Sequence, residues 1–360
     1  MTASNGLPSA HRVNGGRRRP LRIGVVGLGY WGPNLVRVLQ ERPDVEVAWA
    51  CDARRSALKG IARRYPGVRR TQQLERVLRD RNMSAVAIAT PVATHHELAS
   101  AALRAGKHVF VEKPLAASSE EALDLIELSK ERGLVLMPGH TFLYSPPVNL
   151  IRDLIQSGEL GDLYFISASR VNLGLHQSDV SVAWDLGPHD FSILRYWLDE
   201  MPLRVTAVSR SCIFPNTPDV AFITLEFPSG TLAHVELSWL APSKLRRTAI
   251  VGSRKMVVYD DTSTEPVRIF DSGVAFPVPE SFGEYRLAYR TGSIVSPPVD
   301  AAEPLALEFA EFAAAIQTGS TPRSSAAMGL DVLRIVEAVD SSLREGGRPV
   351  PMSAETPLLA

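Results

Sequence analysis

The sequence contains little of what several large classes of protein require. It has only two cysteines, Cys51 and Cys212, too few for a disulfide framework, so we expect a reducing compartment in which both pack as small hydrophobic side chains. The formal net charge is zero, whereas a chain that follows a phosphate backbone usually carries a basic excess. No stretch approaches the roughly 18 apolar residues of a membrane span. We therefore expect neither a nucleic-acid partner nor a membrane partner.

The first residues, Met1 to Pro20, are rich in Ser, Gly, Asn and Arg and lack the apolar core of a signal peptide. The basic cluster Arg17–Arg19 can belong to a solvated tail or contact nucleic acid or a membrane, and we favour the tail. The sequence thus predicts a disordered tail over residues 1–20 and a cytoplasmic protein.

The chain of 360 residues is long enough for two domains of roughly 100–200 residues each. Over residues 21–139, apolar strand-like runs alternate with helical stretches, the pattern of an α/β unit with a doubly wound parallel sheet. The expected strands are Leu21–Gly27, Val45–Cys51, Ala85–Ala89, His108–Val111 and Val135–Pro138, and the expected helices are Trp31–Arg42, Arg54–Tyr65, His95–Ala105 and Ser118–Arg132.

Over residues 140–360 the pattern changes to longer strands. Apolar and polar residues alternate across Ala221–Phe227, the period of a sheet with one buried face, and Pro228–Gly230 predicts a hairpin turn to Thr231–Ser238. Thr262–Asp300 is rich in Pro, Ser and Gly and indicates loops with short strands. This part is therefore predicted to be an α+β domain. Its other strands are expected at Leu163–Val171, Val205–Ser211, Lys244–Gly252 and Arg254–Tyr259, and its helices at Pro146–Ser157, Pro304–Thr318 and Ala326–Glu345.

Gly27-Leu28-Gly29-Tyr30-Trp31-Gly32 has the spacing G-x-G-x-x-G between a buried strand and a helix. Gly27 allows a tight turn, Gly29 lets the backbone approach a pyrophosphate, and Gly32 lets the helix pack closely on the strand. The helix N-terminus offers free N–H groups to the phosphates. Asp52 ends the second strand, where a carboxylate can bind the adenosine ribose hydroxyls. A glycine-rich turn without a ligand is the alternative, but the coincidence of these features predicts a dinucleotide site.

The choice between NAD and NADP rests on the residues that end the second strand. Asp52 favours NAD because a carboxylate repels a 2′-phosphate, whereas Arg54 and Arg55 could receive that phosphate. We expect NAD, with NADP as the alternative. Trp31 has two interpretations that stay open: it covers the dinucleotide, or it packs as a core aromatic residue.

Two further clusters carry candidate chemistry. Glu112-Lys113-Pro114 ends a predicted strand, where ligands bind in such sheets, so Lys113 is well placed beside a nicotinamide. Alone, a lysine before a proline is more often a surface loop residue. Asp185 and His189 are four residues apart and can share a helical face or converge across a turn. The alternative for this pair is a capping acid and a structural histidine.

Together these segments resemble one family, the glucose–fructose oxidoreductase/inositol dehydrogenase (Gfo/Idh/MocA) oxidoreductases. The resemblance runs from Leu21 to about Pro351 and implies a second domain built on a large, open, mixed sheet. The exposed face of that sheet often forms an oligomer interface, so a homo-oligomer, dimer or tetramer, is expected. The matching segments are Gly27–Gly32, Thr90-Pro91 with His95, Glu112-Lys113-Pro114, Asp185 with His189, and the C-terminal run Glu308–Gly347.

The resemblance also implies the roles of the site residues. Lys113, Asp185 and His189 would form the catalytic set. Tyr144 and Asn149 could touch sugar hydroxyls with Asp185 and His189, or serve in ordinary packing at a helix start. We expect no metal, because no Cys or second His lies near His189 in the sequence. The expected cofactor-binding residues are Gly27, Gly29, Tyr30, Trp31, Gly32, Asp52, Thr90, His95, Glu112 and Lys113.

Within that family, Gly139–Tyr144 and Trp184–Asp190 are most similar to the sugar 3-dehydrogenases, including those that act on nucleotide sugars. The implied reaction oxidises the C3 hydroxyl of a pyranose, in a nucleotide sugar or an aminoglycoside-type glycoside, to a keto sugar suited to transamination. His189 would be the general base, Lys113 would stabilise the alkoxide, and Asp185 would orient His189 or hold a hydroxyl.

Three other functions stay open at this point: a deoxysugar 3-ketoreductase, an NAD-retaining glycoside hydrolase, and a dinucleotide sensor without catalysis. An aminoglycoside would call for acidic groups in the pocket, for which Asp179 and Glu284 are candidates.

Overall fold

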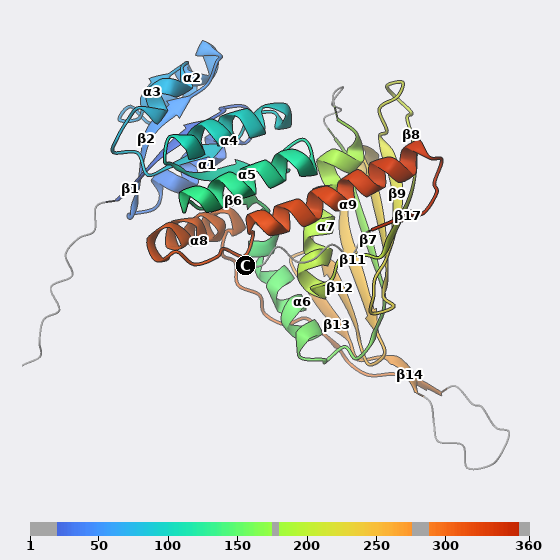
Figure 1. Ribbon diagram of the computed structural model, residues 1–360. Helices are drawn as coiled ribbons and strands as arrows, with labels where there is room; N and C mark the ends of the chain where they lie inside the picture. The colour runs from blue at the N-terminus through green and yellow to red at the C-terminus, as the bar shows by residue number, and fades with distance from the viewer. Residues whose placement is uncertain (1–19, 175–179, 276–287, 353–360) are drawn as a thin grey trace, which may run out of the picture.

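A computed structural model of the protein describes residues 20–174, 180–275 and 288–352. The predicted tail, apart from Pro20, and the acidic candidates Asp179 and Glu284 lie outside these ranges. Two sheets organise the described chain, one on either side of a layer of helices (Figure 1).

The first sheet has six parallel strands in the order β3-β2-β1-β4-β5-β6. This order confirms the predicted doubly wound Rossmann sheet, whose halves meet between β1 and β4. The central strands are apolar runs because both of their faces are covered; all four residues of β4 are buried. The strands are β1 (Leu21–Val26), β2 (Val45–Cys51), β3 (Arg69–Thr71), β4 (Ala85–Ile88), β5 (His108–Glu112) and β6 (Leu136–Gly139).

Helices that follow these strands cover both faces of the sheet (Figure 1). The start of α5 is fixed by Ser118, whose hydroxyl accepts the Glu121 N–H at 3.1 Å, and by the Glu121 carboxylate, which accepts the Ala117 N–H. The helices are α1 (Gly32–Gln40), α2 (Arg55–Arg64), α3 (Leu74–Leu78), α4 (His95–Arg104) and α5 (Ser119–Arg132), with a 3₁₀ turn η1 (Val92–Thr94) before α4.

The second sheet is mixed and has nine strands, in the order β16-β13-β12-β11-β7-β10-β9-β8-β17. Its one parallel pair among the described strands is β10 with β7. The large open mixed sheet is thereby confirmed. The strands are β7 (Leu163–Leu173), β8 (Arg204–Arg210), β9 (Val220–Glu226), β10 (Leu232–Ser238), β11 (Leu240–Gly252), β12 (Met256–Asp260), β13 (Val267–Phe270), β16 (Ile294–Val295) and β17 (Val350–Pro351); β14 (Gly273–Ala275) and β15 (Ala288–Arg290) pair separately.

Helices cover one face of this sheet and leave the other without a helix (Figure 1). The predicted alternation is present in β9, where Ala221, Ile223 and Leu225 are buried while Phe222 is 42% exposed. The open face carries further exposed apolar side chains in two cross-strand pairs: Val208 lies opposite Phe222, and Phe165 lies opposite Leu232 four residues further along the strands. The covering helices are α6 (Pro146–Gln156), α7 (Val182–Leu198) and α9 (Ala326–Arg344).

The last two helices join the units. In α8 (Pro304–Thr318), Phe309 packs on Phe110 of β5 with ring centroids 4.6 Å apart. The long helix α9 contacts α5 and β6 of the first unit and α7 and β8 of the second. Its Leu330 and Leu333 lie in the first unit's core, while Val336 lies in the core that extends to the large sheet.

Several features differ from the sequence predictions. Asp185 and His189 lie in one helix, α7, which settles the choice between a helical face and a turn. The short elements β3, α3 and β17 were not predicted, because three polar residues, a five-residue helix and a two-residue strand carry no periodic signal. Cys51 is buried as expected, but Cys212 is exposed, so its predicted packing is wrong.

Candidate active site

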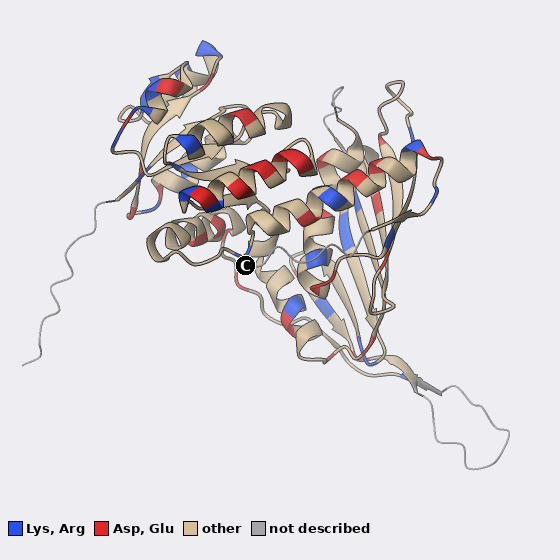
Figure 2. Ribbon diagram, viewed as in Figure 1, with Lys and Arg blue, Asp and Glu red and all other residues tan. Residues whose placement is uncertain are grey.

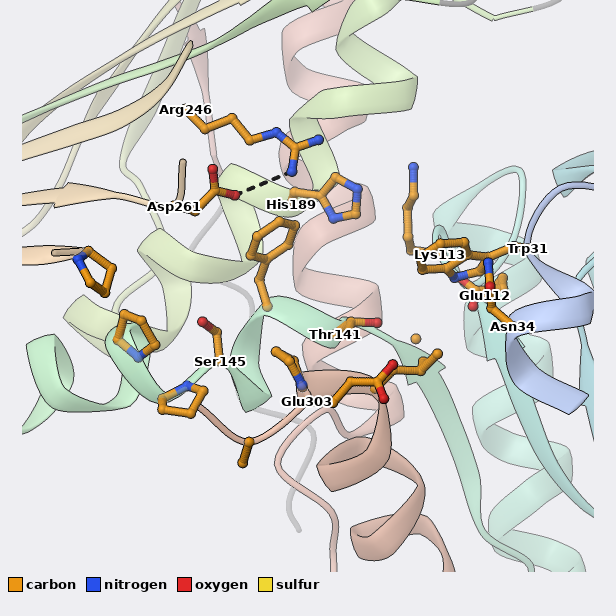
Figure 3. A pocket seen from close by; sticks show the side chains of 18 of the residues that line it. Trp31, Asn34, Glu112, Lys113, Thr141, Ser145, His189, Arg246, Asp261 and Glu303 are labelled. Carbon is orange, nitrogen blue, oxygen red and sulfur yellow. Dashed lines mark hydrogen bonds and ion pairs between the residues drawn. The ribbon is translucent and has the colours of Figure 1, made fainter. Parts of the chain in front are cut away.

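A cavity of about 980 Å³ lies between the two units, beside the carboxyl ends of the parallel strands (Figure 3). One wall comes from the Rossmann unit, chiefly the segments that follow β1, β4 and β5. The opposite wall comes from α7, from the large sheet and from the segment before α8. The position is the one at which open α/β sheets bind ligands.

The glycine turn fits the phosphates of a dinucleotide. Gly27 has φ +87°, and a Cβ there would lie 2.4 Å from the Ala89 carbonyl oxygen. A Cβ at Gly32 would lie 1.9 Å from the Gly27 carbonyl oxygen, so both positions need the close approach that only glycine allows. A Cβ at Gly29 meets only the Arg54 side chain, at 3.7 Å. The surface of Gly29 therefore stays open to a ligand, as the sequence predicts.

The Asp52 side chain stabilises this turn through hydrogen bonds. Its carboxylate accepts the Leu28 and Arg54 N–H groups, each at 2.7 Å, and an ion pair from the Arg54 guanidinium at 3.2 Å. Burial opposes ionisation of Asp52, but these hydrogen bonds outweigh it and lower its pKa. The carboxylate is therefore charged at neutral pH and lies where a ribose would bind, while Arg54 is largely exposed beside it.

The aromatic pair that precedes α1 faces the cavity. Tyr30 and Trp31 line it, are 84% and 37% exposed, and stack with an interplanar angle of 7°. Trp31 is therefore not a core residue. Of the two interpretations left open, its position favours the one in which the indole ring covers a bound dinucleotide.

Thr90 lines the cavity, whereas His95 lies behind it. The His95 ring is 1% exposed and sits between the carbonyl oxygens of Thr90 and Pro114, at 2.9 and 2.8 Å. Burial lowers the His95 pKa, so the neutral ring donates to one of these carbonyls. His95 thus ties two loops of the cofactor wall together and does not itself border the cavity.

Glu112 is buried at the end of β5 and lines the cavity. Burial raises its pKa to about 8, against the opposing effects of Lys113 and of a hydrogen bond from Trp31. One carboxyl oxygen, Oε1, has no hydrogen-bond partner among the described residues. Gly139 leaves room for the Glu112 side chain because it has no side chain of its own: a Cβ at this position would lie 3.2 Å from Oε2 of Glu112.

Lys113 and Asp185 meet across the cavity from the two units. The Lys113 Nζ donates to the Asp185 backbone oxygen at 2.7 Å and contacts its Oδ1 at 3.3 Å. The other carboxylate oxygen of Asp185 accepts the Trp239 indole N–H at 3.2 Å. Asp185 therefore holds the ammonium of Lys113. Among the described residues its carboxylate makes no hydrogen bond to the His189 ring, so of its two expected roles the orientation of His189 finds no support, and contact with a substrate hydroxyl stays a prediction.

His189 lies on the same face of α7 as Asp185, one turn on, and lines the cavity. Burial, followed by the positive charges of Lys113, Arg170 and Arg246, lowers its pKa well below the ordinary value. Its Nδ1 is buried without a partner among the described residues, and the Phe142 ring meets it edge-on at 5.0 Å. The ring is therefore neutral and able to accept a proton.

Three ion pairs surround this imidazole. Lys113–Asp185 has been described, and Arg170 binds Asp190 through two hydrogen bonds of 2.6 and 3.1 Å in the interior. Arg246 contacts Asp261 at 3.3 Å. Each cation near His189 thus has its own carboxylate, which lets positive charges lie close to the ring without leaving a buried charge unpaired.

Two more ionisable groups lie close to the cofactor wall. His140 follows β6, is 1% exposed, and has no hydrogen-bond partner for either ring nitrogen among the described residues; burial lowers its pKa to about 3. Glu308 of α8 accepts the Thr141 hydroxyl at 2.7 Å, and its burial raises its pKa well above the ordinary value. His140 is therefore uncharged at neutral pH, and the surroundings of Glu308 favour its protonated form.

The structure does not bring Tyr144 and Asn149 into the cavity. Tyr144 is 1% exposed and its hydroxyl bonds to the Ser324 hydroxyl at 3.0 Å. The Asn149 side chain donates to the Leu143 and Ser145 carbonyls and accepts from the Tyr196 hydroxyl. Their polar groups are satisfied internally, which corresponds to the packing alternative and not to contact with a sugar.

Several residues that line the cavity were not singled out in the sequence. Arg246 is the one with a usable signal: it occupies the inward phase of β11 with Thr248 and Ile250, where a charge is unusual. The others carry no sequence pattern that marks a cavity: Asn34 and Arg37 of α1, Tyr259 of β12, and Thr141, Phe142, Ser145, Asp261, Ser263 and the segment 300–305.

The described ranges lack two other features. No helix there is both long and apolar enough for a transmembrane segment. No group of three or more His, Cys, Asp or Glu residues is arranged to hold a metal ion. Lys and Arg residues are interspersed with Asp and Glu over both units in the view of Figure 2, and several acidic residues lie along α5.

Residues 21–140 match the profile described as oxidoreductase family, NAD-binding Rossmann fold, and residues 148–258 match the GFO/IDH/MocA C-terminal domain. Among curated relatives, 2,7-anhydro-N-acetylneuraminate hydratase of Escherichia coli (strain K12) is 29% identical over 60% of this chain and 61% of the relative. Inositol 2-dehydrogenase 2 of Saccharopolyspora erythraea is 30% identical over 60% of this chain and 66% of the relative. The chain spans about three fifths to two thirds of these two proteins.

Among solved structures, GenD2 from gentamicin A biosynthesis in complex with NAD has a TM-score of 0.80 and 24% identity, and the match covers 97% of this chain and 100% of that chain. This likeness concerns the fold. With its Rossmann sheet and about half of its second unit matched to the two domains of one family, the chain belongs to the GFO/IDH/MocA oxidoreductases.

Proposed function

We propose that this oxidoreductase is an NAD-dependent dehydrogenase of a sugar, oxidising one secondary alcohol of a pyranose ring to a ketone. The observation that carries the proposal is the meeting of Lys113, Asp185 and an uncharged His189 in one cavity beside the glycine turn. The position proposed for oxidation is the C3 hydroxyl. The substrate classes are a nucleotide sugar and an aminoglycoside-type glycoside, the second supported by the fold shared with GenD2.

The residues of the first wall fit NAD. Gly29 would lie against the pyrophosphate, Asp52 would bind the ribose hydroxyls, and Trp31 would cover the dinucleotide. When bound, NAD supplies the hydride acceptor of the reaction. Arg54 is the residue through which NADP would be accepted instead, and its pairing with Asp52 supports the choice of NAD.

Residues from both walls supply proton transfer and charge. His189 takes the hydroxyl proton, since its neutral imidazole has an uncharged nitrogen to receive it. Lys113 stabilises the negative charge that develops on the substrate oxygen, and Asp185 keeps the ammonium aimed into the cavity. Read in reverse, the same groups serve a ketoreductase, so the direction is decided by equilibrium and supply of substrate.

A second candidate function is a reaction in which NAD is cycled without net reduction. The observation in its favour is the relative from Escherichia coli, which is named a hydratase and not a dehydrogenase. A glycoside hydrolase that retains its NAD belongs to the same class.

We also propose that the chain forms a homo-oligomer, a dimer or tetramer, through the open face of the large sheet. Exposed Phe165, Phe222 and Leu232 on that face support the proposal, because apolar residues grouped on one surface favour an interface. Sedimentation should give a mass above one chain, and Phe222→Arg should shift it towards the monomer; a monomeric wild-type protein would contradict the proposal.

The experiment that tests the function is an incubation of the protein with NAD and, separately, NADP, against UDP-sugars, dTDP-sugars and aminoglycosides. Nicotinamide reduction is followed by absorbance and the products by mass. Reduced NAD with a product two hydrogens lighter supports the dehydrogenase. A converted substrate without reduced cofactor supports the second candidate and overturns the first.

A further inference from the structure

Beyond the three residues proposed for catalysis, the cavity contains the charged side chain of Arg246, which has no role in the proposed proton or hydride transfer. Arg246 lies on the other side of His189 from Lys113 (Figure 3). It projects from the inward phase of β11, directly across from Arg170 of β7 in the strand register. The neighbouring Arg247 is exposed on the opposite phase. Arg246 is thus directed at the reaction site by the strand itself.

Two contacts join Arg246 to Asp261, one through the backbone and one through the guanidinium. Asp261, which follows β12, donates its N–H to the Arg246 carbonyl at 3.2 Å, and its carboxylate meets Nη1 at 3.3 Å. The two side chains keep 29% and 16% of their surface exposed. Like charges across neighbouring strands repel each other, and Asp190 and Asp261 offset the charges of Arg170 and Arg246.

The ion pair with Asp261 uses only part of the hydrogen-bonding capacity of the Arg246 guanidinium. A guanidinium carries five N–H groups, and among the described residues its one partner is Asp261, through Nη1. An oxygen atom in the cavity can therefore accept a hydrogen bond from Arg246 without displacing Asp261. Arg246 lies next to His189, so that oxygen would belong to a carbon close to the one that reacts.

The charges around Arg246 decide which kind of oxygen fits. Its positive charge is offset by Asp261, and Asp300 brings further negative charge to the cavity, whereas the charge of Glu303 is paired with Arg37. A carboxylate or phosphate would have to compete with Asp261 for Arg246, whereas a hydroxyl only accepts a hydrogen bond. The arrangement favours a neutral hydroxyl over an anionic group.

We propose that Arg246, held by Asp261, is the specificity residue of the cavity and binds a neutral hydroxyl on a ring carbon adjacent to the reacting one. This inference rests on the proposed function, because it takes the reacting alcohol to lie at His189. It identifies the substrate class of this part of the cavity as an uncharged vicinal diol.

The test compares wild type with Arg246→Met and, as matched control, Arg247→Met on the opposite phase of the same strand. Proteins saturated with NAD are titrated with methyl α-D-glucopyranoside and its 2-deoxy and 4-deoxy analogues by ligand-observed NMR, and nicotinamide reduction is read in the same samples. We expect removal of one adjacent hydroxyl to weaken binding about tenfold in wild type and Arg247→Met, and to have no effect in Arg246→Met.

Equal deoxy penalties in wild type and Arg246→Met would overturn the proposal, as would the absence of binding to wild type. Tighter binding of methyl α-D-glucuronide than of the glucoside by wild type would overturn it in favour of an anion site. Asp261→Asn, which releases the ion pair, should increase affinity for that glucuronide. If Arg246→Met does not fold, Arg246→Lys is the second variant, because lysine keeps the positive charge but lacks the planar guanidinium. It should lose most of the difference in affinity between the glucoside and its deoxy analogues.

The two proposals fail in different ways. An Arg246-dependent deoxy penalty without any reduced NAD would overturn the dehydrogenase and leave the diol site standing. Reduced NAD with the same deoxy penalty in all three proteins would overturn the diol site and leave the dehydrogenase.

Discussion

The two walls of the cavity are built in different ways. The cofactor wall relies on bare backbone, with Gly27 and Gly32 packed so tightly that a single methyl group would collide with a carbonyl oxygen. The opposite wall relies on charged side chains: Asp185 is paired with Lys113 across the cavity, and Arg246 is paired with Asp261 within its own wall. A dinucleotide is recognised by its shape against the backbone, whereas a sugar ring is recognised by directed donors and acceptors.

The largest effect should come from the wall that carries the chemistry. His189→Ala should lower kcat by about 10²–10⁴-fold, because the proton acceptor is lost, while the affinity for NAD stays unchanged. Steady-state kinetics and a calorimetric NAD titration measure the two quantities. His96→Ala, an exposed histidine on α4 paired with Asp124, serves as the control and should leave both unchanged. A parallel loss of NAD affinity in His189→Ala would remove the distinction between the walls.

The next effect should fall on the cofactor wall alone. Gly32→Ala places a Cβ 1.9 Å from the Gly27 carbonyl oxygen and must distort the turn, so NAD affinity should fall at least about tenfold. Gly60→Ala in α2, where a Cβ meets nothing within 4 Å, should instead stabilise the protein by about 0.5–1 kcal/mol. Calorimetry and thermal unfolding distinguish the two; unchanged NAD binding by Gly32→Ala would show that the turn is not the phosphate site.

A third effect is a pH dependence of stability that belongs to the cofactor wall. Burial raises the pKa of Glu112 from 4.5 to about 8, so folding favours its protonated form, and the free energy of unfolding falls as pH rises from about 4.5 to about 8. Glu112→Gln should remove roughly 1–3 kcal/mol of that decline, measured by urea unfolding at pH 5.5 and pH 8 without cofactor. The exposed Glu97→Gln is the control. The same slope in Glu112→Gln and wild type would mean that Glu112 ionises normally.

The smallest effect concerns a contact between the walls. Arg37 of α1 binds the Glu303 carboxylate through both terminal nitrogens, at 3.1 and 2.5 Å, and so ties the segment before α8 to the cofactor helix. Both side chains are partly exposed, so Glu303→Gln should cost less than about 1 kcal/mol of stability. Release of NAD, followed by stopped-flow fluorescence, should become a few times faster. A slower release would show that this segment does not restrain the cofactor.

The parts of the candidate site that could be predicted from the sequence are those defined by a short local pattern of residues. The turn Gly27–Gly32 and the strand end at Asp52 are defined by spacing alone, and Asp185 and His189 share a face once the segment is helical. The Rossmann sheet was predictable because alternating buried strands and helices leave a strong periodic signal.

Reasoning from the sequence failed where the direction of a side chain depends on tertiary packing. Tyr144 and Asn149 are close in sequence to cavity residues, yet their polar groups turn inward to Ser324 and Tyr196. Arg246 and Asp261 become partners through the register of β11 and β12, which no local pattern reveals. His95 is next to the site but supports it from behind.

The helix α9 has a consequence for how the molecule comes apart. Because Leu330 and Leu333 complete the core of one unit while Val336 belongs to the core reaching the other, neither unit can melt without exposing apolar surface of its neighbour. Heating should therefore produce a single cooperative calorimetric transition. The two walls of the cavity would then be lost together, and a damaged substrate unit would not leave behind a free dinucleotide-binding domain.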